Sequence, residues 1–174
     1  MQDPSPKVYR IGAKVDVDVE ENLISILETE NVGYERLTHE PVYTSKQASE
    51  VRGVPLETGV KAMVLEPEDG ALILALVSAD HRVDLEKLGE EEGTEVNLAD
   101  PEEVLEVTGC EIGSVPPFGH RESLNTYLDP GVLDKKRVNF NAGKHDVSVA
   151  MDSEDLPRCI KSSGARLNIL PIRQ

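Results

Sequence analysis

The chain has 174 residues, of which 33 are acidic and 18 are basic, so its formal net charge is −15. A chain of this length can bury roughly 70% of the surface that it exposes when unfolded, which is enough for one hydrophobic core. The negative charge argues against non-specific binding to nucleic acids or anionic lipid surfaces. Any contact with a polyanion must therefore be local.

Two cysteines, Cys110 and Cys159, are too few for a disulfide framework or a cysteine metal site. Residues 1–10 lack an apolar segment, and the longest apolar run, residues 71–77, is too short to cross a bilayer. These features predict a cytoplasmic protein without a membrane anchor. We expect residues 1–15 to form an N-terminal tail and residues 16–174 to form a single domain.

The first part of that domain is predicted to contain a helix, a strand and a second helix, at residues 19–31, 34–37 and 45–51. Asp18 is a candidate N-cap for the first helix, which Gly33 ends. Thr44, followed three residues later by Gln47, forms the capping-box pattern that starts the second helix.

Two apolar runs, residues 59–66 and 71–77, predict a central hairpin around the turn at 67–70. The second run is apolar on both faces, as in a strand that is covered on each side.

The second half of the chain alternates between helical and strand patterns. Helices are predicted at 84–88, at 100–107 and after Asp152 and Asp155, strands at 126–128, 137–140 and 147–151, a polar connection at 90–95, and a turn at 142–144. Together with the hairpin, this order predicts an α/β (α+β) fold, with a mixed β-sheet and flanking helices.

Residues 108–119 contain three glycines and two prolines, which exclude a regular helix. Gly109 and Gly113 can adopt positive φ and let a ligand approach the main chain, while Pro116 and Pro117 stiffen the segment. The segment therefore reads either as a rigid pocket wall or as an ordinary connection between a helix and a strand.

Lys61 is the most informative single residue, because it lies within the apolar run Val60–Leu65. A charge that faces inward there is costly unless it contacts an anion or lines a cleft. The alternative is that Lys61 points outward from an edge strand.

The usual catalytic and metal-binding motifs are absent. Histidines 39, 81, 120 and 145 have no metal-ligand spacing, so neither a metal nor another cofactor is predicted. Ser114 is not in a GxSxG elbow, and Cys110 reads as a small residue that fits a tight loop rather than as a nucleophile. A basic cluster at 135–137 and 144–145 is either a solvated turn or a local phosphate contact.

Four segments in order, residues 39–44, Lys61, residues 108–119 and residues 139–144, resemble the YbaK/ProX family of trans-editing aminoacyl-tRNA deacylases. These proteins are related to the editing domain inserted in bacterial prolyl-tRNA synthetases. The resemblance implies a mixed, partly barrel-like sheet, no metal, and hydrolysis of the ester that joins a wrong amino acid to tRNA.

By the same resemblance, Lys61, Gly113 and Ser114 are expected to be catalytic. The residues expected to bind substrate are His39, Thr44, Pro116, Phe118, Gly143 and Ser148. Backbone N–H groups would stabilise the oxyanion that forms on the acyl carbonyl, and the segment at 116–118 would size the pocket.

The expected substrates are of the Cys-tRNA(Pro) or Ala-tRNA(Pro) type. The expected partners are the acceptor end of tRNA and a prolyl-tRNA synthetase, and the sequence sets no oligomeric state. The alternative is a non-catalytic binding module for an aminoacyl-adenylate-like ligand or for a synthetase. Leu37 and the acidity of the chain favour that alternative.

Overall fold

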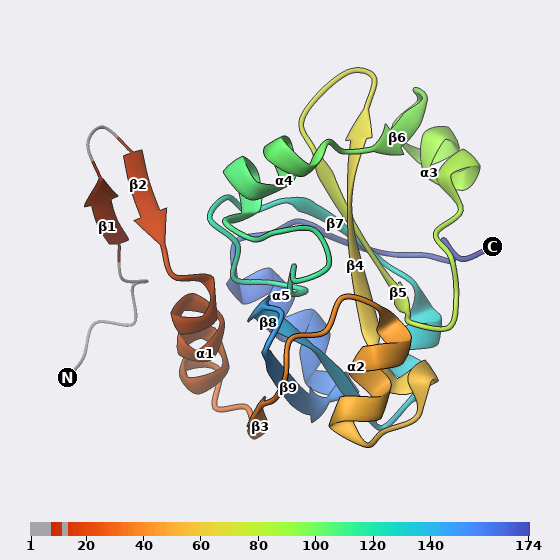
Figure 1. The fold of residues 1–174 in the computed structure, drawn as a ribbon. Helices are drawn as coiled ribbons and strands as arrows, with labels where there is room; N and C mark the ends of the chain where they lie inside the picture. The colour runs from red at the N-terminus through yellow and green to blue at the C-terminus, as the bar shows by residue number, and fades with distance from the viewer. Residues whose placement is uncertain (1–7, 12–13) are drawn as a thin grey trace.

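The computed structural model describes residues 8–11 and 14–174 of the chain (Figure 1). The strands are β1 (Val8–Ile11), β2 (Lys14–Val17), β3 (Tyr34–Thr38), β4 (Val60–Pro67), β5 (Ile73–Ser78), β6 (Val96–Leu98), β7 (Asn125–Leu128), β8 (Arg137–Lys144), β9 (Val147–Asp152) and β10 (Leu167–Ile169). The α-helices are α1 (Val19–Thr29), α2 (Ser45–Arg52), α3 (Leu85–Glu92), α4 (Pro101–Thr108) and α5 (Leu156–Ser162).

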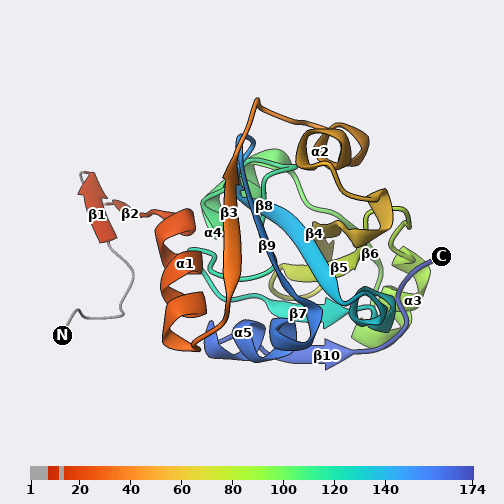
Figure 2. The ribbon, with the colours of Figure 1, turned by 90° about the horizontal axis from the view of Figure 1, so that it is seen from below.

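Two sheets form the body of the protein. The five-stranded sheet is mixed and has the order β10-β7-β5-β4-β6, and the three-stranded sheet is antiparallel and has the order β3-β9-β8. Figure 2 shows β3, β9 and β8 side by side, with α1 and α5 nearby. Among the described residues, a single parallel bridge between Gly59 and Asn139 links the two sheets. This confirms the α+β fold, but neither sheet closes into a barrel within the described part of the chain.

The hydrophobic core is divided by the five-stranded sheet. Leu74 and Leu76 of β5 pack with α1, β8 and β9 on one face. Ile73, Ala75 and Val77 pack on the other face, with α3 and the C-terminal segment. Every residue of β5 is buried, which confirms the prediction of a strand covered on both sides.

The predicted starts of α1 and α2 are confirmed in their hydrogen bonds. The Asp18 side chain accepts a bond from the Glu21 amide at the start of α1. The Thr44 hydroxyl accepts one from the Gln47 amide at the start of α2, and the Gln47 side chain accepts one in return from the Tyr43 amide. The bonds from the Glu21 and Gln47 amides satisfy N–H groups that the first helical turn leaves without partners.

Two local predictions are wrong and one strand was not predicted, and tertiary pairing explains all three. The predicted connection at 90–95 is helical as far as Glu92, and residues 96–98 form β6 because β4 offers them hydrogen bonds. The predicted turn at 142–144 belongs to β8, which has a bulge there, and the chain turns at residues 145–146. Strand β10, which has only three residues, forms by pairing with β7.

The N-terminal segment pairs with itself. Strands β1 and β2 form an antiparallel hairpin that crosses the expected boundary at residue 15. Residues 1–7, 12 and 13 of the expected tail lie outside the described residues. The division into a tail and one domain therefore stays a prediction.

Candidate active site

A cavity of about 430 Å³ opens between α2, β4, β8 and the loop that follows α4. Its position follows from the sheet register. Strand β6 pairs with β4 only through Leu65–Pro67, so the preceding half of β4 has a strand neighbour only on the β5 side, among the described residues. Residues 59–64, on that edge, line the cavity. Most of the lining is apolar, which makes the few polar groups in it conspicuous.

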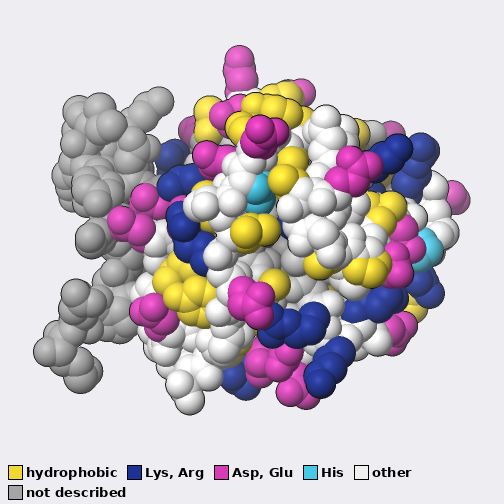
Figure 3. All heavy atoms as spheres, turned by 60° about the horizontal axis from the view of Figure 1, so that its bottom comes forward, with side chains coloured by type: hydrophobic (Ala, Val, Ile, Leu, Met, Phe, Trp, Pro, Cys, Tyr) yellow, Lys and Arg dark blue, Asp and Glu magenta, His cyan; other side chains and the backbone are white. Residues whose placement is uncertain are grey.

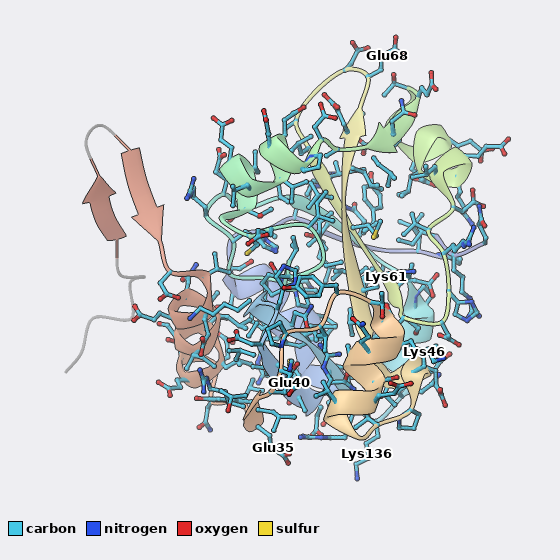
Figure 4. The ribbon with its side chains drawn as sticks, in the orientation of Figure 1. Glu35, Glu40, Lys46, Lys61, Glu68 and Lys136 are labelled. Carbon is cyan, nitrogen blue, oxygen red and sulfur yellow. The ribbon has the colours of Figure 1, made fainter. Side chains whose placement is uncertain are left out.

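Lys61 lines this cavity from β4 (Figure 4). Its ammonium group donates a hydrogen bond of 2.5 Å to the carbonyl oxygen of His81. Burial lowers the pKa of Lys61, and the nearby charge of Arg82 lowers it further, while Asp80 raises it. The side chain thus lies on an edge and faces a cavity, which combines the two alternatives that the sequence left open.

Gly113 lines the same cavity from a tight turn. The Ser114 amide donates to the Glu111 carbonyl across this turn, and Gly113 has a φ of 89°, which only glycine adopts without strain. Within residues 18–174, the Gly113 N–H donates to no protein acceptor. The lining of the cavity therefore includes a residue with a spare main-chain donor and a residue with a cationic side chain.

Ser114 follows Gly113 but does not line the cavity. It is 1% exposed, its hydroxyl donates to the Glu111 carbonyl, and its carbonyl accepts a bond from the Gly143 amide. Its amide is used in the turn, so Ser114 holds the turn in place and offers no free donor to a ligand.

Arg52 closes the floor of the cavity from the end of α2. Its guanidinium donates to the Ser148 hydroxyl at 2.7 Å, to the Asn139 side-chain oxygen at 2.9 Å, and to the Asn141 side-chain oxygen. Burial lowers the pKa of Arg52 to about 10. The residue remains a cation at neutral pH, and its acceptors are neutral.

His39 and Ser148 extend this network away from the cavity. His39 Nδ1 donates to the Glu40 carbonyl at 2.7 Å, which leaves Nε2 as an acceptor 2.6 Å from the Ser148 hydroxyl. Ser148 can satisfy both neighbours, because it accepts from Arg52 and donates to His39. Both residues therefore support the floor of the cavity from behind.

The other expected site residues are spread over three environments. Thr44 lines the cavity at the start of α2. Gly143 lies against Val19, whose side chain is 3.1 Å from the position that a Cβ would take. Pro116 and Phe118 are buried and are not among the lining residues, and Phe118 packs edge-on against Phe140 in the core. The structure thus gives residues 116–118 a place in the core rather than in the pocket wall.

The basic cluster expected from the sequence is mostly neutralised. Arg137 pairs with Asp152 and Glu35, and Lys144 pairs with Glu20. Figure 4 shows Lys136 at the opposite end of the molecule from Glu68, and away from Lys61. On the face seen in Figure 3, basic side chains are dispersed among acidic ones. This distribution favours the solvated-turn interpretation of the cluster.

Sequence reasoning missed Arg52 and gave no role to Asn139 and Asn141. An arginine in the last turn of a helix ordinarily faces solvent beside the terminal carbonyl groups, so its sequence position carried no signal. The two asparagines did carry one, because positions i and i+2 of a strand lie on the same face. Only the packing of α2 over β8 brings the three side chains together.

Cys110 is 1% exposed, and burial raises the pKa of its thiol to about 12. We expect it to stay protonated and to resist alkylation in the folded protein, since the thiolate is the reactive form. Iodoacetamide should label Cys110 at least ten times faster after unfolding in urea, as measured by mass spectrometry. Fast labelling of the native protein would revive the thiol nucleophile as a candidate.

Within the described residues, no three histidine, cysteine or carboxylate side chains are grouped as metal ligands. The helices of the same residues are all too short or too polar to span a bilayer.

Comparison with known proteins places this cavity in a family context. The model of the aminoacyl-tRNA editing domain matches residues 39–159. The multifunctional Ser/Thr-tRNA deacylase ProXp-y of Escherichia coli is 35% identical over an alignment of 143 residues that covers 79% of this chain and 86% of that protein. A proline–tRNA ligase of Trichlorobacter lovleyi is 33% identical over an alignment of 146 residues that covers 72% of this chain but 25% of the ligase.

A solved structure described as a candidate trans-editing enzyme for prolyl-tRNA synthetase superimposes with a TM-score of 0.75 at 30% identity. The match covers 90% of this chain and 97% of that chain. The residues matched by the family model, 39–159, include all residues that line the cavity, among them Lys61 and Gly113. The resemblance inferred from the sequence is confirmed. The chain belongs to the aminoacyl-tRNA editing domain family.

Proposed function

We propose that this protein hydrolyses the ester bond of mischarged aminoacyl-tRNA in trans. The observation that carries the proposal is that Lys61 and Gly113 line one cavity in a chain of the editing-domain family. The purified protein should release the amino acid from at least one member of a panel of alanyl-, cysteinyl-, seryl- and threonyl-tRNAs. If folded protein leaves every member intact, the proposal is wrong. Ligand-dependent stabilisation without hydrolysis would then favour a binding module.

The chemistry asks little of the side chains, because an aminoacyl ester is already activated. A water molecule attacks the acyl carbonyl, the Gly113 N–H donates to the oxyanion that forms, and the ammonium group of Lys61 adds positive charge nearby. The bond between the carbonyl carbon and the ribose oxygen then breaks. The free amino acid leaves, and the ribose hydroxyl recovers a proton. No protein nucleophile is needed.

The cavity favours a small aminoacyl group. Its walls combine the small apolar side chains of Ala48 and Ala62 with the hydroxyl groups of Thr44 and Ser49. A hydrophobic wall distinguishes one methylene group by about 1 to 3 kcal/mol, so large amino acids are rejected more readily than small ones are told apart. We therefore expect alanyl, cysteinyl, seryl and threonyl esters of tRNA(Pro) or similar tRNAs to be the substrates. The E. coli relative is itself named a Ser/Thr-tRNA deacylase.

The mouth of the cavity suits an unpaired nucleic-acid end. Tyr43, Leu98 and Ile112 line it and are 67%, 59% and 52% exposed. The ring of Tyr43 also contacts the ring of His145 in a tilted arrangement, with 4.6 Å between the ring centroids. An acidic protein repels phosphates but can stack neutral bases on exposed apolar groups. We expect the single-stranded acceptor end to lie across these three side chains. Such a substrate implies a cytoplasmic location, with prolyl-tRNA synthetase as the source of mischarged tRNA.

Tyr43→Ala should raise KM for aminoacyl-tRNA by about 5- to 150-fold, the equivalent of roughly 1 to 3 kcal/mol of base stacking. The kcat should change little, because Tyr43 is remote from the bond that breaks in this proposal. Ile169→Ala is the matched control, since Ile169 is 49% exposed on β10 and does not line the cavity. Equal KM values for both variants would contradict the placement of the acceptor end.

In this arrangement the protein contacts few tRNA phosphates, so its affinity for tRNA should depend only weakly on salt concentration. A plot of log affinity against log salt concentration should have a slope of magnitude roughly 2 to 3. A much steeper slope would mean that the tRNA body is held by its phosphates.

A further inference from the structure

Arg52 is a partly buried cation at the floor of the cavity, and none of its hydrogen bonds within residues 18–174 goes to a carboxylate. A charge withdrawn from water without an opposite charge costs stability. A hydrophobic residue would suit the end of α2 at a lower cost in free energy. Stability of the fold therefore does not explain why an arginine occupies position 52.

The explanation lies in what Arg52 does to its neighbours. Arginine can only donate, so the amide oxygen of Asn141 must face the guanidinium, and the Asn141 NH₂ group must point the other way. On that side, it donates to the carbonyl oxygen of Gly113. The orientation of this amide is thus set by chemistry and leaves no ambiguity between its oxygen and nitrogen.

The same fork fixes a second side chain. Arg52 also donates to the Asn139 side-chain oxygen, and the Asn139 NH₂ group donates onward to the Thr58 hydroxyl at 2.9 Å. A planar guanidinium can hold two amides and the Ser148 hydroxyl at fixed angles, whereas the lysine ammonium is a point charge on a flexible stem. The network therefore requires arginine rather than positive charge alone.

We propose that Arg52 is a positioning residue, which acts through Asn141 to hold the Gly113 turn with its free N–H in the catalytic orientation. This inference rests on the proposed deacylase function. The carbonyl of Gly113 is tied to β8 by Asn141, and the Ser114 carbonyl is tied to β8 by the Gly143 amide. With both anchors in place, the turn cannot rotate away from the cavity. Without Arg52, the Asn141 amide is free to turn and the first anchor is lost.

The first test is Arg52→Lys, which keeps the charge and removes the fork. A displacement of about 1 Å in a catalytic group costs roughly 10²-fold in rate, so kcat should fall by about that factor while KM changes little. Arg158→Lys is the matched control, because Arg158 forms ion pairs with Glu30 and Asp155 on the surface. That variant should keep the wild-type kcat.

The second test is Asn141→Asp, which separates positioning from folding. The carboxylate can still accept from Arg52 and now compensates its charge, so thermal stability should be kept or raised. It has no N–H to donate to the Gly113 carbonyl, so kcat should still fall by roughly 10²-fold. A merely structural role for the network predicts the opposite, namely that activity follows stability.

The outcomes distinguish this inference from the function on which it rests. An inactive wild-type protein would end the proposed function itself. An active wild type with an unchanged kcat in folded Arg52→Lys, or in Asn141→Asp, would overturn only the positioning role. Loss of kcat in a stable Asn141→Asp variant supports that role even if Arg52→Lys fails to fold.

Discussion

Lys61→Met should lower kcat for deacylation by about 10²- to 10³-fold without destabilising the protein. The loss is of the size seen when one group that stabilises an oxyanion is removed. Methionine keeps the length of the stem and removes a charge whose pKa is lowered, chiefly by burial. Single-turnover hydrolysis and thermal unfolding should be measured on the same preparation.

The stability of this variant has a predictable dependence on pH. A folded-state pKa below the unfolded value means that the charged lysine favours unfolding. The penalty is fully present below the folded-state pKa, and it disappears as the pH rises to the unfolded value near 10.5. The advantage of Lys61→Met in unfolding free energy should therefore shrink in alkaline solution.

Lys46→Ala is the control for Lys61→Met. Lys46 is an exposed lysine on α2 that is labelled in Figure 4 and is not among the residues that line the cavity. Its removal should leave kcat within about twofold of the wild type, since exposed charges are screened by water and salt. A Lys61→Met variant as active as Lys46→Ala would remove the cation from the mechanism.

Gly113→Ala should lower kcat by a similar factor, about 10²-fold or more, through the backbone rather than through a side chain. A Cβ at this position meets nothing closer than His145 Cε1, at 3.6 Å, so space is available. The φ of 89° is the obstacle, because alanine there costs roughly 1 to 2 kcal/mol. The turn should relax and carry its N–H away from the oxyanion. Steady-state kinetics, with kcat and KM resolved, will detect this change.

Gly93→Ala provides the matched comparison. Gly93 caps α3 with a φ of 74°, has open space around it and does not line the cavity. It should lose comparable stability and keep its activity. If both glycine variants lose kcat in parallel with their melting temperatures, the Gly113 turn has a structural role only.

The sequence predicted some elements of the fold and missed others, depending on how local their signals are. The capped helices α1 and α2 and the hairpin of β4 and β5 were predictable, because caps, glycines and apolar periodicity act over a few residues. Strands β6 and β10 were not, since three residues have too little pattern of their own and form only where β4 and β7 offer a partner. Phe118 was assigned to the pocket through the family resemblance, yet its bulky side chain is buried in the core.

The sequence by itself indicated the fold class, the family and the importance of Lys61, because a charge within an apolar run is exceptional. It marked Gly113 through the family resemblance, since a glycine in a turn is common and has no functional signal of its own. Only the tertiary structure decided that these two residues share one cavity and that Arg52 anchors its floor. The physical reason is distance along the chain. Arg52, Gly113 and Asn141 are joined by hydrogen bonds that exist only after α2 and the turn have packed against β8.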